Sequence, residues 1–151
     1  MLRFAEKQGR EIYMIGAKEI ELAGRLADVA GGVIRPFFRA SFDHEAKADS
    51  TPVTEADRAA EAAIRAILDV ECPTDAIVGE EYGEKSGTSG RTWVIDPIDG
   101  TISFMAGRPI FGTLIALLED GWPVLGVIDQ CINRERWIGV AGQGTTLNGK
   151  P

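Results

Sequence analysis

The stretch that decides the fold reads Trp93-Val94-Ile95-Asp96-Pro97-Ile98-Asp99-Gly100-Thr101. Its apolar, β-branched start, over residues 92–95, predicts a buried strand. Two carboxylates follow, Asp96 and Asp99, and the strand is predicted to end at Ile95, which would place both at its carboxyl end. Pro97 stiffens the turn between them. Gly100 permits close approach of the backbone, and a short helical turn is predicted over residues 101–106.

This turn is suited to a divalent metal that faces a phosphate. Mg²⁺ prefers oxygen ligands, keeps several waters and is often shared with a substrate phosphate. The Ile98 carbonyl can point into the same space as the two carboxylates, and amides at a helix start favour phosphate oxygens. The Thr101 hydroxyl can orient a water. Asp-Pro and Asp-Gly also form ordinary turns, so this motif alone leaves a purely structural role open.

Two more acidic elements lie upstream, Val53-Thr54-Glu55-Ala56-Asp57 and Gly79-Glu80-Glu81. Taken alone, Asp57 fits the electrostatics of a helix start, and Glu80 fits a solvated loop. The combination carries the interpretation, because all three acidic elements stand at element boundaries within 43 residues. Together they predict a site in which two or three ions polarise a phosphoryl group, activate a water and stabilise the leaving oxygen.

The rest of the chain predicts an α+β fold, with two long helices packed on a mostly antiparallel sheet. Apolar residues recur at a helical period over residues 17–42, where Gly31-Gly32 and Pro36 are expected to bend the helix. A second helix is predicted to start with Thr54 as its cap and Asp57 completing a capping box. A loop is expected over residues 83–91. Strands are predicted at residues 76–78, 92–95, 111–118, 123–128, 136–140 and 145–147.

Composition narrows the class of protein. The 151 residues, 44% of them hydrophobic, suit one domain. A net charge of −7 argues against a nucleic-acid partner, and an acidic protein that handles an anion needs bound cations.

No apolar run approaches the roughly 20 residues that span a membrane. The two cysteines, Cys72 and Cys131, predict no disulfide scaffold, which favours a reducing, cytoplasmic location. The single histidine, His44, argues against a histidine-based hydrolytic site.

In this order and spacing, the three acidic elements resemble the inositol monophosphatase family of Mg²⁺-dependent phosphatases, over roughly residues 22–151. The resemblance implies that Glu80, Asp96 and the Ile98 carbonyl bind one metal and that Asp96 and Asp99 bind a second. Glu80 would hold a third, looser ion. It also implies hydrolysis by in-line attack of water, with no covalent phospho-enzyme, and inhibition by Li⁺.

The same resemblance implies a catalytic and a substrate-binding set. Asp57 and Thr101 would orient and activate the attacking water beside the metal ligand Glu80. Asp99 and the amides of Gly100 and Thr101 would face the phosphorylated substrate. Ile102 departs from the polar residues common in the family at that position, which affects contacts at the rim of the site and not metal binding.

Flanking segments resemble the histidinol-phosphate phosphatase branch of the family, which acts in histidine biosynthesis. These segments are residues 107–118, 126–130, 135–137 and 145–149. They are mainly predicted strands, so inositol phosphates and other sugar or nucleotide phosphates stay open as substrates.

Family members continue for a second domain, which supplies a further aspartate in a Trp-Asp motif. In this chain Trp122 precedes Pro123 and Trp137 precedes Ile138. We therefore expect residues 1–151 to form one N-terminal, metal-binding domain, with the C-terminal domain absent from the chain. Apolar sheet surface left exposed would favour a homodimer or other self-association. The alternative to an enzyme is a truncated, non-catalytic half that folds and self-associates.

Overall fold

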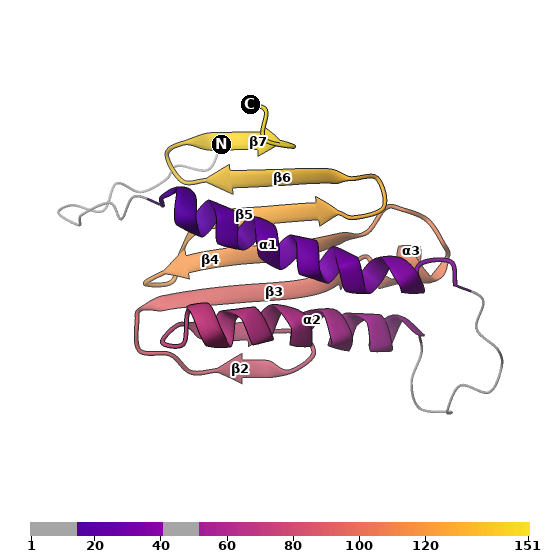
Figure 1. The fold of residues 1–151 in the computed structure, drawn as a ribbon, viewed down its shortest axis with the longest axis horizontal. Helices are drawn as coiled ribbons and strands as arrows, with labels where there is room; N and C mark the ends of the chain where they lie inside the picture. Colours follow the sequence, from indigo (N-terminus) through magenta and orange to yellow (C-terminus); the bar gives the residue numbers. More distant parts are fainter. Residues whose placement is uncertain (1–14, 41–51) are drawn as a thin grey trace.

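The computed structural model describes residues 15–40 and 52–151 (Figure 1). The helices are α1 (Ala17–Ile34), the short 3₁₀ helix η1 (Arg35–Phe37), α2 (Pro52–Glu71) and α3 (Thr101–Met105). The strands are β1 (Ala76–Gly79), β2 (Gly83–Lys85), β3 (Arg91–Asp99), β4 (Gly112–Glu119), β5 (Trp122–Gln130), β6 (Glu135–Val140) and β7 (Gly144–Leu147). None of the described helices is long and apolar enough to cross a membrane.

The strands form one sheet in the order β2-β1-β3-β4-β5-β6-β7. Among the described strand pairs, β1 and β3 alone run parallel, and every other pair is antiparallel. The predicted α+β class with a mostly antiparallel sheet is therefore confirmed. The parallel pair matters for function, because it brings the carboxyl ends of β1 and β3 to the same edge of the sheet.

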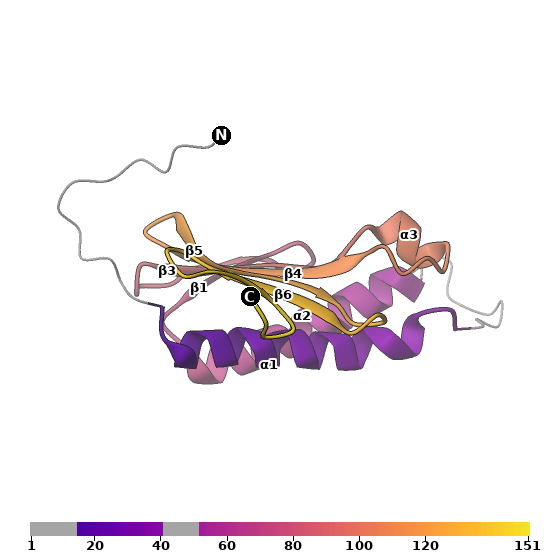
Figure 2. The same ribbon diagram turned by 90° about the horizontal axis from the view of Figure 1, so that it is seen from above.

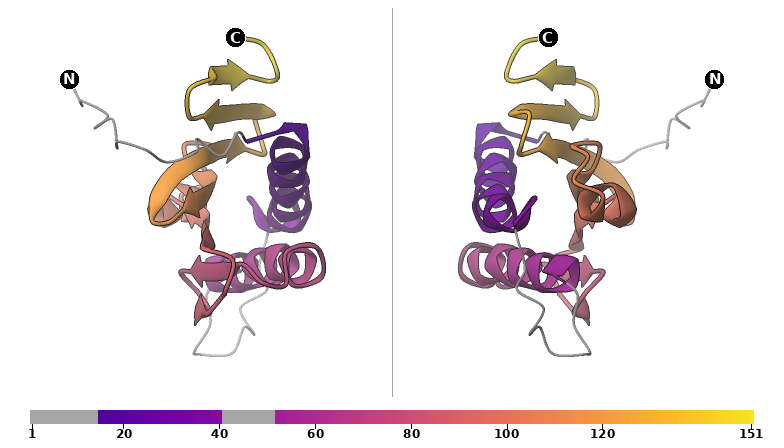
Figure 3. Two further views of the ribbon diagram at one scale, coloured as in Figure 1. Left: turned by 90° about the vertical axis from the view of Figure 1, so that its left-hand side faces the viewer. Right: turned by 90° about the vertical axis from the view of Figure 1, so that its right-hand side faces the viewer.

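Both long helices cover one face of the sheet (Figures 2 and 3). The core lies between them and the inward side chains of the strands, which alternate with outward ones. Trp93 on β3 is paired with Leu117 on β4, which is paired with Leu125 on β5, and all three are buried. The indole Nε1 of Trp93 donates a 3.0 Å hydrogen bond to Asp75, so its one polar atom is satisfied within the core.

Neither long helix covers the opposite face of the sheet, which we call the open face; the short helix α3 lies on that side at one end only (Figure 2). One row of paired residues across it runs from Asp96 through Leu114 and Ile128 to Trp137. Ile128 and Trp137 are 54% and 45% exposed. The open face is therefore an apolar surface, and one end of this row is an aspartate of the predicted site.

Three local predictions away from β3 differ from the structure. The helix predicted over residues 17–42 ends at Ile34, and Pro36 falls in the separate 3₁₀ helix η1; only residues 41 and 42 of that prediction lie outside the described residues. The predicted cap at Thr54 is wrong, because α2 already begins at Pro52, a residue well tolerated at the first helical position. The loop predicted over residues 83–91 contains the short edge strand β2, which pairs with β1.

Candidate metal centre

The predicted site residues come from the ends of three elements, β1, β3 and α2. Gly79 is paired with Ile95 across the parallel ladder, so the next residues, Glu80 and Asp96, follow at neighbouring strand positions. Asp57 lies in the first turns of α2, which packs against β3, and it is 7% exposed. Residues far apart in sequence are therefore collected at one edge of the sheet.

Strand β3 runs through to Asp99, so the prediction that it ends at Ile95 is wrong. Its pairing with β4 shifts from Asp96–Leu114 to Asp99–Gly112, which leaves two residues opposite Thr113. This is a β-bulge, and such bulges redirect side chains at sheet edges. The buried Thr113 hydroxyl donates a 2.8 Å hydrogen bond to the Pro97 carbonyl. The bulge is thus fixed by the neighbouring strand, and both carboxylates still lie at the carboxyl end of β3.

The turn into α3 depends on Gly100. Its φ is +96°, a conformation that side chains rarely adopt, and a Cβ there would lie 3.2 Å from the Ile110 carbonyl oxygen. The Gly100 carbonyl accepts hydrogen bonds from the amides of Ser103 and Phe104. Thr101 is exposed, and its hydroxyl donates a 3.3 Å hydrogen bond to the Ile98 carbonyl. The predicted helical turn therefore forms directly after the second aspartate.

The carboxylates influence one another's protonation. Burial, followed by the negative charges of Glu81, Asp96 and Glu80 in that order, raises the pKa of Asp57 to about 7. Burial, together with Glu80 and then Asp99, raises the pKa of Asp96 to about 6. Negative charge is therefore concentrated where α2, β1 and β3 meet.

Two buried oxygens of this cluster lack a hydrogen-bond partner among the described residues, Asp57 Oδ1 and Asp96 Oδ1. A buried carboxylate oxygen is costly unless a donor or a cation satisfies it. The surrounding side chains supply oxygen atoms and negative charge, which is the donor set that a hard divalent cation prefers. The residues present therefore fit Mg²⁺.

The ligand side chains do not yet converge on one point. Within residues 15–40 and 52–151, no three carboxylates, imidazoles or thiolates are grouped closely enough to hold a metal. Glu80 and Asp99 are exposed, and Asp96 is half-buried. The backbone thus brings the predicted ligands to one edge, where their like charges repel one another.

Sequence reasoning missed Glu61, a fully buried carboxylate in α2 that contacts the turn containing Glu80. A signal was available. Glu61 follows Asp57 by one helical turn and precedes the buried Ile64 and Leu68, so a charged residue stands within the buried stripe of the helix. A charge at a buried helical position calls for a specific partner.

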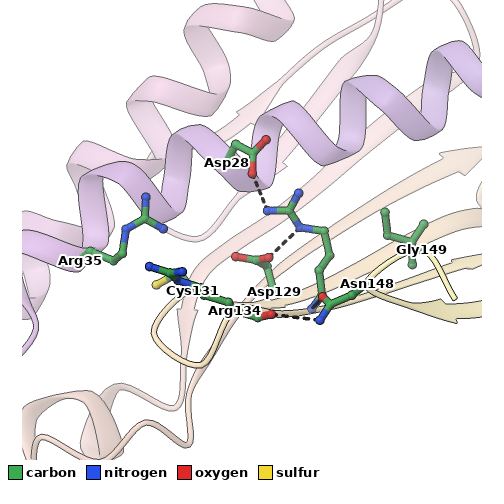
Figure 4. Close-up of a pocket in the computed structure, with 9 residues that line it drawn as sticks. Asp28, Arg35, Asp129, Cys131, Arg134, Asn148 and Gly149 are labelled. Atoms are coloured by element: carbon green, nitrogen blue, oxygen red, sulfur yellow. Dashed lines mark hydrogen bonds and ion pairs between the residues drawn. The ribbon is translucent and has the colours of Figure 1, made fainter.

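A separate pocket of about 620 Å³ lies between α1 and strands β5 and β6 (Figure 4). Its two carboxylates, Asp28 and Asp129, each accept a 2.7 Å hydrogen bond from the Arg136 guanidinium. Arg136 also donates to the Gly24 carbonyl, so it ties β6 to α1. Because both carboxylates are already paired, this pocket does not offer a second cation site.

Comparison with known proteins adds independent information. The inositol monophosphatase family matches residues 17–151. A chloroplastic bifunctional phosphatase of Arabidopsis thaliana, IMPL2, is 54% identical over 127 residues, which are 83% of this chain and 37% of that protein. A histidinol-phosphatase of Mycobacterium tuberculosis is 43% identical over 127 residues, 83% of this chain and 49% of that protein.

The fold has solved counterparts. An inositol monophosphatase from Zymomonas mobilis matches with a TM-score of 0.79 and 55% identity, over 93% of this chain and 53% of that one. The chain therefore spans about half the length, or less, of the relatives that it matches.

Proposed function

The chain belongs to the inositol monophosphatase family, and from this premise we propose that it is the N-terminal, metal-binding part of a Mg²⁺-dependent phosphomonoesterase. The observation that carries the proposal is the pair of buried, unpartnered oxygens on Asp57 and Asp96, set among further carboxylates. A divalent cation would satisfy such oxygens, and a phosphate monoester is a substrate that bound cations can neutralise.

In this proposal the ligand set holds two or three ions. Glu80, Asp96 and the Ile98 carbonyl would hold the first, Asp96 and Asp99 the second, and Glu80 a third. When bound, these ions would polarise the phosphoryl oxygens and make a coordinated water more acidic. The remaining work falls to side chains that hold the water and the phosphate.

Asp57 and Thr101 would position the attacking water. Without metal, burial and the neighbouring carboxylates raise the pKa of Asp57 to about 7, and an ion bound nearby would favour its ionised, proton-accepting form. The Thr101 hydroxyl donates a hydrogen bond to the Ile98 carbonyl, so the lone pairs of the hydroxyl oxygen can accept a hydrogen bond from water. The amides of Gly100 and Thr101 would hold the phosphate, with Asp99 at the exposed rim facing the substrate.

Histidinol phosphate is the proposed substrate, and inositol 1-phosphate the principal alternative. The histidinol-phosphatase of Mycobacterium tuberculosis supports the first, and the inositol monophosphatase of Zymomonas mobilis supports the second. The test is a substrate panel on the protein at the full length of its relatives, with and without Mg²⁺. We expect kcat/KM for histidinol phosphate to exceed that for inositol 1-phosphate by about tenfold, or ~1.4 kcal/mol. The reverse ratio would favour the alternative, and no Mg²⁺-dependent release from any monoester would contradict a phosphatase.

A second proposal concerns the open face and assigns it a role in self-association instead of catalysis. Exposed Ile128 and Trp137 favour self-association of the 151-residue chain, as a homodimer, whether or not it is catalytic alone. Sedimentation velocity tests this with Ile128→Lys and a matched control, Val70→Lys, which alters an exposed apolar residue of α2. We expect the first variant alone to be monomeric; association that survives in Ile128→Lys would exclude the open face.

A further inference from the structure

The Glu61 carboxylate accepts hydrogen bonds from the turn after β1 and from one arginine. The side chain is 0% exposed. Its Oε1 accepts from Arg65 Nε at 2.7 Å and from the Tyr82 amide at 3.3 Å, and its Oε2 accepts from the Glu81 amide at 2.8 Å. All three donors are N–H groups, so the position requires two accepting oxygens.

Gly79 makes room for this carboxylate. A Cβ at Gly79 would lie 1.9 Å from Glu61 Oε1 and 2.3 Å from its Cδ. Any side chain at residue 79 would therefore displace Glu61 from the turn. The glycine that precedes the two acidic residues of Gly79-Glu80-Glu81 is thus explained by the close packing of a carboxylate against the backbone.

The far side of the same turn is also attached to α2. Arg65 donates to the Gly83 carbonyl through its second guanidinium nitrogen. The guanidinium groups of Arg58 and Arg65 lie 5.5 and 5.9 Å from the centre of the Tyr82 ring, within the range of cation–π contact. The backbone on both sides of Glu80 is therefore fixed by α2, whereas the Glu80 side chain is exposed and close enough to Asp96 to raise its pKa.

We propose that Glu61 is a positioning residue for Glu80, so that metal affinity depends on a buried carboxylate whose two oxygens each accept a hydrogen bond from the turn. This inference rests on the proposed function, because it takes Glu80 as a metal ligand. Removing a partner that orients a metal ligand typically weakens metal affinity or activity by 10–100-fold. In Glu61→Gln, one accepting oxygen becomes an NH₂ group that faces an N–H donor, while the size of the side chain is kept.

The test measures Mn²⁺ binding to the chain by isothermal titration calorimetry. We expect Glu61→Gln to raise the dissociation constant by roughly tenfold or more. The matched control is Glu84→Gln, the same chemical change at an exposed residue of β2, which should bind as wild type does. In the full-length enzyme, raising the Mg²⁺ concentration should restore kcat of Glu61→Gln, which a merely structural defect would not allow.

The outcomes separate the inference from the function on which it rests. A folded Glu61→Gln variant whose Mn²⁺ affinity lies within twofold of wild type would overturn the inference. Equal Mn²⁺ affinity of wild type and Glu80→Gln would contradict the metal assignment itself. Amide hydrogen exchange of the wild-type protein provides a second measurement, which does not depend on the folding of a variant. The Glu81 amide should be protected by its bond to Glu61, and exchange at the rate of an open loop would also overturn the inference.

Discussion

Replacing Asp57 by Asn should make the metal-free protein more stable at pH 8. Burial, with the nearby acidic groups, raises the pKa of Asp57 from its ordinary 3.8 to about 7. Between these two pH values the folded state keeps a proton that the unfolded chain has lost. The free energy of unfolding therefore falls as pH rises from about 4 to 7, and above pH 7 the fold carries the full penalty of a buried carboxylate.

The size of this penalty follows from the pKa difference. About three pH units at ~1.4 kcal/mol each give an upper value of about 4 kcal/mol. We expect about half of it, ~2 kcal/mol, because the site relaxes and admits water when the group ionises. Asn keeps an oxygen that accepts from the Ile98 amide. Its NH₂ group adds a hydrogen-bond donor beside carboxylates, of which Asp96 has an oxygen without a partner among the described residues. For a chain of 151 residues the gain corresponds to about 4–8 °C in Tm.

Thermal unfolding followed by circular dichroism in EDTA, at pH 5 and pH 8, measures the effect. EDTA is needed because a bound cation would favour the ionised carboxylate and reverse the comparison. At pH 5 Asp57 is protonated in the folded protein, so the penalty is absent and the difference between variant and wild type should shrink. A variant that is less stable than wild type at pH 8, or that differs equally at both pH values, would refute this reasoning.

Four further outcomes follow from the site. Asp96→Asn and Glu80→Gln should each nearly abolish activity of the full-length enzyme, a loss larger than the roughly 10–100-fold typical when only a partner of a metal ligand is removed; near-normal turnover would contradict that role. Thr101→Ala should lower kcat through misplaced water, and an effect on KM alone would argue against it. Thr113→Val leaves the Pro97 carbonyl without its donor and should cost about 1–3 kcal/mol in urea unfolding; an unchanged midpoint would show that the bulge does not need the hydroxyl. Mn²⁺ affinity should rise from pH 5 to 7.5, because the ligand Asp96, with a pKa of about 6, must lose its proton, and its neighbour Asp57, with a pKa of about 7, becomes negative in the same range; a flat profile would exclude Asp96 as a ligand.

The fold class could be predicted because helices and strands bury their residues at different periods. Trp93 and Ile95 lie in the core, as the apolar opening stretch predicted, and the structure adds that they alternate with half-buried Val94. The predicted helical turn after Asp99 also formed, because Gly100 can adopt its positive φ. At the buried strand and at this helical turn, the local sequence was therefore sufficient to predict the structure.

Other features depend on contacts that a local pattern does not contain. The strand was predicted to stop at Ile95 because Asp-Pro favours turns, but Thr113 on the neighbouring strand supports a bulge and the ladder continues. The segment after Gly83 has weak strand propensity, and its pairing with β1 makes it an edge strand. Glu61 is a similar case, because its partners lie about twenty residues away in the chain.

The most direct test of the central claim is a crystal of the full-length protein soaked in Mn²⁺ and measured near the manganese absorption edge. The proposed site predicts an anomalous peak within coordination distance of the Glu80 and Asp96 carboxylates and the Ile98 carbonyl, lost on soaking in EDTA. Catalytically active crystals with Mn²⁺ bound only elsewhere, for example beside Asp28 and Asp129, would contradict the account.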